Sequence, residues 1–112
     1  GVYSQAVVSG NTLYISGQIP LIPDSMEIVS ENIEEQIEQV FDNLTAICVE
    51  AGAKLDDTIK FNVYLTDLAH FPKVNTAMEQ RLAAPYPARA VVEVSALPKG
   101  VQVEVDAIVD LS

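Results

Sequence analysis

The fold is decided by residues 32–51, NIEEQIEQVFDNLTAICVEA. Apolar side chains recur there at every third or fourth position, which is the spacing of one face of an α-helix. This face consists of Ile33, Ile37, Val40, Phe41, Leu44, Ile47, Cys48 and Ala51. Asn32 followed by Glu35 is typical of a helix start, and Gly52 stands where a helix ends. We therefore predict a helix over residues 32–51 that buries one face.

Strand patterns lie on both sides of this helix. Five segments have the character of β-strands, and they span residues 2–8, 12–18, 59–65, 89–95 and 101–109. Ser9-Gly10-Asn11 predicts a hairpin turn between the first two. A second helix is predicted over residues 71–82, with Pro72 in its first turn. The order β-β-α-β-α-β-β predicts an α+β domain, in which two helices cover one face of a single mixed sheet.

Alternation along the strands predicts which side chains face the helices. In residues 59–65 the predicted inward set is Ile59, Phe61, Val63 and Leu65. The opposite face carries polar and large side chains, namely Tyr14, Ser16, Lys60, Asn62, Tyr64, Glu104 and Asp106. Such a face is either solvated or part of a wet interface between subunits, and the pattern alone favours neither.

The composition is that of one globular domain. The chain has 112 residues, of which 49% are hydrophobic, which excludes a disordered chain. Residues 1–23 carry no charge but contain many polar side chains and two prolines, so we expect neither a membrane span nor a signal peptide there. The single cysteine, Cys48, cannot form an intramolecular disulfide, which fits a cytoplasmic location.

Charge and residue counts exclude several classes of function. The formal net charge of −10 opposes binding to nucleic acid, and the interleaved basic and aromatic residues typical of RNA binding are missing. One histidine, His70, and one cysteine cannot build an ordinary zinc site. We predict a capping or surface role for His70 and a core position for Cys48. Arg81 and Arg89 are the only arginines, and thus the few candidates for binding an anionic small molecule.

Four short motifs are spread over nearly the whole chain. They are GVYSQA at residues 1–6, SGQIP at 16–20, PARA at 87–90, and LPKG at 97–100 followed by VEVDA at 103–107. Each motif alone is weak, but their order and spacing together are highly specific. The chain resembles the Rid (YjgF) family, whose motifs are G-P-Y-S-Q-A, S-G-Q-I-P, P-A-R-S or P-A-R-A, and L-P-K-G followed by I-E-I-E-A.

The resemblance implies a chorismate-mutase-like fold and a homotrimer whose active sites lie between neighbouring subunits. It also implies a cofactor-free and metal-free enzyme, a 2-iminobutanoate/2-iminopropanoate deaminase. Such an enzyme hydrolyses reactive enamines and imines, for example 2-aminoacrylate, to 2-keto acids and ammonia. Two alternatives stay open: a module that senses small 2-keto acids without turnover, and an endoribonuclease or translation-inhibitor role, which the net charge opposes.

The resemblance also implies roles for single residues. Arg89 falls on the family's substrate-binding arginine, and a guanidinium holds a carboxylate through two parallel hydrogen bonds. Glu104 falls on the glutamate that positions the attacking water. The other implied ligand contacts are Tyr3, Ser16, Gly17, Asn75, Ala90 and Val91. Without the resemblance, Arg89 is an ordinary surface ion pair, Glu104 an exposed carboxylate and Gly17 a strand bulge.

The chain departs from the family pattern in three places. Val91 stands where the family often has cysteine, so no thiol chemistry is expected there. Val2 replaces the usual proline. The sequence also begins inside the first motif, and Tyr3 is therefore expected to be less firmly held.

Overall fold

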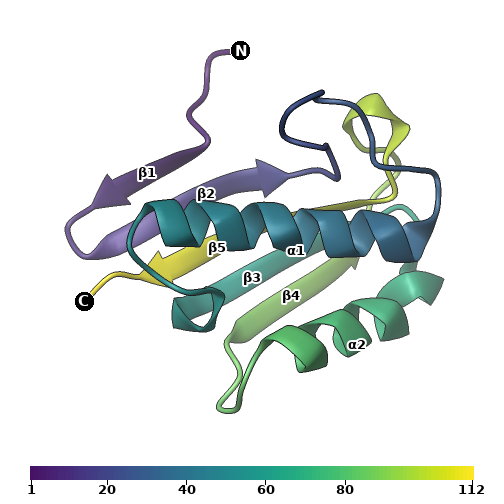
Figure 1. Ribbon diagram of the computed structural model, residues 1–112. Coiled ribbons are helices and arrows are strands. Elements are labelled where there is room, and N and C mark those ends of the chain that lie inside the picture. The colour runs from purple at the N-terminus through teal and green to yellow at the C-terminus, as the bar shows by residue number, and fades with distance from the viewer.

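In the computed structural model, which describes residues 1–112, two helices cover one face of a five-stranded sheet (Figure 1). The strands and helices are β1 (Ala6–Ser9), β2 (Thr12–Gln18), α1 (Ile33–Glu50), β3 (Thr58–Leu65), α2 (Phe71–Arg81), β4 (Ala88–Glu93) and β5 (Val103–Asp110). Single 3₁₀ turns span Leu55–Asp57, Leu68–His70 and Pro98–Gly100. The predicted order of strands and helices is confirmed.

The strand order in the sheet is β1-β2-β5-β3-β4. β4 runs parallel to β3, with α2 as the crossover between them, and the other neighbouring strands are antiparallel. The last strand of the chain therefore lies at the centre of the sheet, and β1 and β4 form its two edges. This arrangement brings the end of the chain between the hairpin and the crossover unit.

The core lies between the sheet and the helices. Phe41 of α1 meets Phe61 of β3 edge to face, with 5.8 Å between ring centroids, and both are fully buried. Cys48 is also fully buried on α1, as predicted, and burial together with the charge of Asp57 raises the pKa of its thiol to about 11. Neither helix combines the length and the hydropathy that a membrane span requires.

The helix ends follow from the residues that cap them. Asn32 accepts a hydrogen bond at Oδ1 from the Glu35 backbone N–H, 3.0 Å away, and so satisfies a free donor of the first turn. At the other end of α1, Gly52 has a φ of 83°, a conformation that favours glycine. α2 begins with Pro72 in its first turn and ends at Arg81, with Leu82 as its C-cap, close to the predicted bounds.

Four predicted strand features are wrong in detail. β1 begins at Ala6 instead of residue 2, β4 ends at Glu93 instead of residue 95, and β5 begins at Val103 instead of residue 101. In β3 an irregularity in the pairing with β5 lies between Thr58 and Lys60. It turns Ile59 outward, 49% exposed, and buries Thr58 in its place.

The predicted second face of the sheet is confirmed as the one that the helices leave bare, which we call the uncovered face. Strand register places Glu104 beside Tyr64, and Asp106 beside Asn62. Neighbouring residues across a sheet share a face, so these four side chains lie together. The uncovered face also exposes Tyr14.

Candidate functional site

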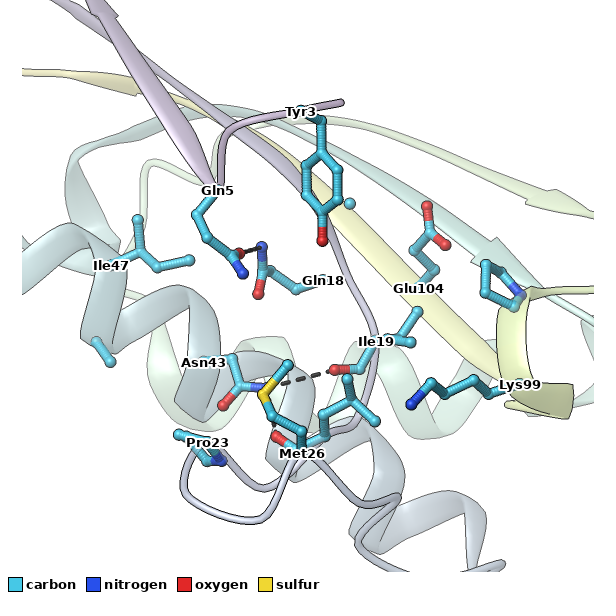
Figure 2. A pocket seen from close by; sticks show the side chains of 14 residues that line it. Tyr3, Gln5, Gln18, Ile19, Pro23, Met26, Asn43, Ile47, Lys99 and Glu104 are labelled. Carbon is cyan, nitrogen blue, oxygen red and sulfur yellow. Dashed lines mark hydrogen bonds between the residues drawn. The ribbon is translucent and has the colours of Figure 1, made fainter. Parts of the chain in front are cut away.

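A hollow of about 690 Å³ lies beside the end of β2. Its walls come from the N-terminal segment, the loop after β2, α1 and the turn before β5 (Figure 2). Three of the predicted site residues line it: Tyr3, Gly17 and Glu104. We call these three residues the Glu104 half-site.

Gly17 and Glu104 touch because β2 is irregular at this point. The register between β2 and β5 shifts between Ile15 and Gln18, so Gly17 lies within a bulge. A Cβ atom on Gly17 would clash with the Glu104 carboxyl group, lying only 2.8 Å from its Cδ. The glycine is therefore what allows the carboxylate to lie against the backbone of β2, and the predicted strand bulge at Gly17 is confirmed.

The Glu104 carboxylate is half-buried and receives no hydrogen bond or ion pair from the rest of the chain. Burial raises its pKa above the ordinary value for glutamate, and the charge of Asp106 raises that pKa further. A carboxylate with a raised pKa accepts a proton more readily. Glu104 can therefore both orient a water molecule and take a proton from it.

Ser16 ties the N-terminal segment to β2. Its hydroxyl donates to the Ser4 carbonyl at 2.6 Å, and its backbone N–H donates to the Gln5 carbonyl at 2.9 Å. These bonds hold the segment that carries Tyr3, whose ring extends toward the hollow while the residue remains 68% exposed (Figure 2). Ser16 thus acts on this half-site through the chain segment that it holds.

Arg89 lies at a second hollow, of about 410 Å³, between β4 and α2. Its Nη1 donates to Asn75 Oδ1 at 2.5 Å and contacts Met78 Sδ at 3.6 Å. The guanidinium also stands 4.9 Å from the centroid of the Phe71 ring, a cation–π contact. Phe71, Asn75 and Arg89 form what we call the Arg89 half-site. Arg89 makes no ion pair, so the expectation of a surface ion pair is wrong.

The remaining two predicted residues lie on β4 next to Arg89. Ala90 is exposed, whereas Val91 is half-buried and packs against the core. Because β4 is an edge strand, its outer side has no strand partner. The Val91 side chain packs against the core, so the backbone of Val91 is the part that remains for ligand contact.

The side chains of Arg89 and Glu104 project from opposite faces of the sheet, so the two half-sites lie on opposite faces. Arg89 pairs with Phe61, which pairs with Ala107, and both of these are buried beneath the helices. Glu104 instead pairs with Tyr64 on the uncovered face. Cross-strand neighbours share a face, so a single chain does not bring Arg89 and Glu104 together.

Several residues at these hollows are absent from the sequence-based set. Phe71 and Met78 lie one turn from Asn75 on α2, and helical spacing would have found them once Asn75 was singled out. Met26, Asn43 and Lys99 line the larger hollow from a loop, a helix and a turn. They have no shared spacing in the sequence, so no local pattern marks them.

Comparison with known proteins places the chain in a family. The family model described as Endoribonuclease L-PSP matches residues 1–111. The chain belongs to the Rid (YjgF, L-PSP) family. Among solved structures of the Rid family, RidA from an Antarctic Psychrobacter is 53% identical, with a TM-score of 0.94 over 98% of this chain and 89% of that one.

Two further relatives are informative about the Rid family. The 2-iminobutanoate/2-iminopropanoate deaminase of Dermatophagoides farinae is 40% identical over 109 residues, which are 97% of this chain and 85% of the relative. E. coli TdcF, whose crystal structure contains bound serine, is 37% identical, with a TM-score of 0.90 over 100% of this chain and 90% of that one. The match to TdcF extends over both half-sites.

Proposed function

We propose that this protein is a deaminase that hydrolyses reactive enamines and imines of 2-amino acids to 2-keto acids and ammonia. The observation that carries the proposal is the Glu104 carboxylate, unpaired, half-buried and held against Gly17 at a hollow. The relatives named 2-iminobutanoate/2-iminopropanoate deaminase support the same reaction. Small 2-imino acids are therefore the substrate class we assign.

Arg89 is the group that we assign to the substrate carboxylate. Asn75 and Phe71 hold its guanidinium without neutralising it, so its charge is available to a ligand. A guanidinium makes two parallel hydrogen bonds to a carboxylate, which fixes the orientation of the ligand as well as its position. The exposed position of Arg89 at the free edge of β4 leaves it accessible.

The reaction then needs one water and one proton acceptor. An enamine first tautomerises to the imine, and the oxygen of a water held by Glu104 bonds to the imine carbon. One water proton passes to the Glu104 carboxylate and from there to the nitrogen, which gives a carbinolamine. The remaining hydroxyl proton then passes to the nitrogen as the C–N bond breaks, so that ammonia leaves and the carbon becomes the keto carbon. We assign the backbone near Gly17 and Val91, with Tyr3, Ser16, Asn75 and Ala90, to holding the substrate. Positioning and one base suffice because such imines already hydrolyse in water.

We further propose that the active site forms between subunits of a homotrimer. Arg89 and Glu104 leave opposite faces of the sheet, so the two half-sites of one chain cannot share a ligand. A ring of three chains allows the Arg89 half-site of one subunit to meet the Glu104 half-site of the next. The resemblance to the Rid family implies the same assembly.

Mixing two inactive variants tests the shared site. Arg89→Lys keeps Glu104, and Glu104→Gln keeps Arg89, so we expect each variant alone to lose most of its activity. Refolding them together at equal concentration produces mixed trimers in which about one quarter of the sites have both groups intact. Activity near that level is the expected result, with Arg89→Lys/Glu104→Gln double-variant chains as the inactive control. No recovery in mixed trimers, or a monomer by light scattering, would contradict the shared site.

Glu104→Gln tests the chemistry. Glutamine keeps the shape and can still hydrogen-bond a water, but it cannot accept the proton. We expect turnover of 2-iminobutanoate generated in the assay to fall by roughly 10²–10⁴-fold, the usual contribution of a general base. Binding of 2-ketobutyrate by calorimetry should persist through Arg89. A wild-type chain that binds 2-keto acids but does not accelerate imine hydrolysis would instead be a sensor.

The description of the family model also names a ribonuclease, and the charge of this chain argues against that activity. The chain has 16 acidic and 6 basic residues, so phosphate backbones are repelled. Purified protein should leave RNA intact at physiological salt. RNA cleavage that survives repurification and disappears in Arg89→Ala would favour the ribonuclease.

A further inference from the structure

A polar cluster lies next to Glu104 on the uncovered face. Asp106 accepts two hydrogen bonds, from Asn62 Nδ2 to Oδ1 at 2.8 Å and from the Tyr64 hydroxyl to Oδ2 at 3.0 Å. Both donors come from β3, whereas Asp106 belongs to β5. We call Asn62, Tyr64 and Asp106 the β3–β5 cluster. It holds one carboxylate in a fixed place on an otherwise open face of the sheet.

The cluster is tied to Glu104 by the geometry of the strands. Glu104 and Asp106 are two residues apart on β5, so their side chains leave the same face. Tyr64 of β3 pairs directly with Glu104 of β5, but its hydroxyl donates to Asp106. Thus the tyrosine beside Glu104 leaves that carboxylate free and instead fixes its charged neighbour.

Within one chain few other charges face Glu104, and in the proposed trimer Arg89 of the partner subunit faces it as well. Lys99 lines the same hollow from the turn before β5, and Lys60 lies on the uncovered face of β3. Neither lysine forms an ion pair with Glu104 or Asp106. Tyr3 from the N-terminal segment and Tyr64 from β3 are the remaining titratable neighbours, and β2 contributes the uncharged residues Gly17 and Gln18 to the same hollow. Asp106 is therefore the fixed negative charge that lies closest to Glu104 along β5.

We infer that Asp106 is a positioning residue that makes Glu104 a stronger proton acceptor, with Asn62 and Tyr64 holding its charge in place. The inference rests on the proposed function, in which Glu104 takes a proton from the attacking water. The Asp106 carboxylate is held in place and forms no ion pair, so its negative charge disfavours the charged form of Glu104. In agreement, the pKa of Glu104 is raised by burial first and then by the charge of Asp106.

The test compares pH profiles of kcat/KM for imine hydrolysis. Activity falls on the acid side as Glu104 becomes protonated, and the midpoint of that fall reports its proton affinity. Asp106→Asn removes the charge and keeps the shape, so the acid midpoint should move to lower pH. Asp106→Glu keeps the charge and should leave the midpoint near that of the wild type. Asp110→Asn removes the same charge further along β5 and is the matched control.

Tyr64→Phe separates the inference from a merely structural role of the cluster. This substitution weakens the cluster but keeps the Asp106 charge, so it should lower stability without moving the acid midpoint as Asp106→Asn does. If Asp106→Asn and Asp110→Asn keep the same acid midpoint, the inference is overturned. Asp106→Ser provides the same comparison if the asparagine variant does not fold.

A measurement without turnover separates this inference from the proposed function. The carboxyl carbon of Glu104, labelled with ¹³C and assigned by its absence in Glu104→Gln, can be titrated by NMR in the wild type and in Asp106→Asn. A titration midpoint that moves to lower pH supports the inference even if no imine is hydrolysed. An unchanged midpoint overturns it even if the protein proves to be a deaminase.

Discussion

The chain has two arginines, and their surroundings differ sharply although one belongs to α2 and the other contacts it. Arg81 belongs to α2 and reaches α1, where its Nη2 donates to Glu38 Oε2 at 2.6 Å and to Asp42 Oδ1 at 2.8 Å. Its side chain is only 21% exposed. Arg89 on β4 contacts an amide, a thioether and an aromatic ring, and no carboxylate.

This difference separates a structural arginine from one that can bind a ligand. An anion approaching Arg81 must displace two carboxylates, whereas one approaching Arg89 displaces only neutral neighbours. The contrast is informative because the chain has 16 acidic residues, and Glu79 lines the same hollow as Arg89 without pairing with it. The absence of a partner for Arg89 thus distinguishes it within an acidic protein.

The largest expected difference between the two arginines is in activity. Arg89→Lys keeps the positive charge but loses the two-pronged contact, so kcat/KM should fall by about 10- to 100-fold, the value of one charge-assisted hydrogen bond. Arg81→Lys is the matched control and should stay within about twofold of the wild type. Steady-state rates of imine hydrolysis measure both. Normal turnover in Arg89→Lys would shift the carboxylate contact to Arg81.

For stability we expect the opposite order, with Arg81 contributing more than Arg89. Arg81→Met leaves Glu38 and Asp42, two like charges one turn apart on α1, without their shared partner. We expect the free energy of unfolding to fall by about 1–2 kcal/mol, and by less in Arg89→Met. Urea denaturation followed by circular dichroism measures both. A greater loss in Arg89→Met would mean that Arg89 is mainly structural.

The smallest effect concerns the residue that holds Arg89. Asn75→Ala removes the hydrogen bond to Nη1, so the guanidinium becomes less ordered before substrate binds. We expect KM to rise by about three- to tenfold with little change in kcat. Thr76→Ala on the same helix loses only a bond to the Pro72 carbonyl and is the control. Equal kinetics in the two variants would show that Asn75 does not position Arg89.

Most of the fold could be predicted from periodicity, since helices and strands bury faces with different repeats. The errors arise where a strand depends on its partner. Ile59 fits the alternation of β3, yet the irregular pairing with β5 turns it outward. Residues 2–5 look like a strand, but regular pairing with β2 begins only at Ala6, and Ser4 and Gln5 are held by Ser16 outside the strand.

The candidate site was predictable in its residues but not in its arrangement. Alternation does not assign a face to β4, because Val91 and Val92 are both apolar and point to opposite sides. The opposed positions of Arg89 and Glu104 therefore became clear only from the register of three strands. The bonds from Asn62 and Tyr64 to Asp106 depend on the same register, which no local pattern encodes.

The burial of Cys48 has a practical consequence. A thiol that is fully buried, with a pKa near 11, holds almost no thiolate at neutral pH and is out of reach of alkylating reagents. The native chain therefore does not react with thiol-directed labels and needs no cysteine removed before site-directed labelling. A single cysteine introduced at exposed Ala90 would be the only one to react, and a fluorophore attached there would report directly on whatever approaches the free edge of β4.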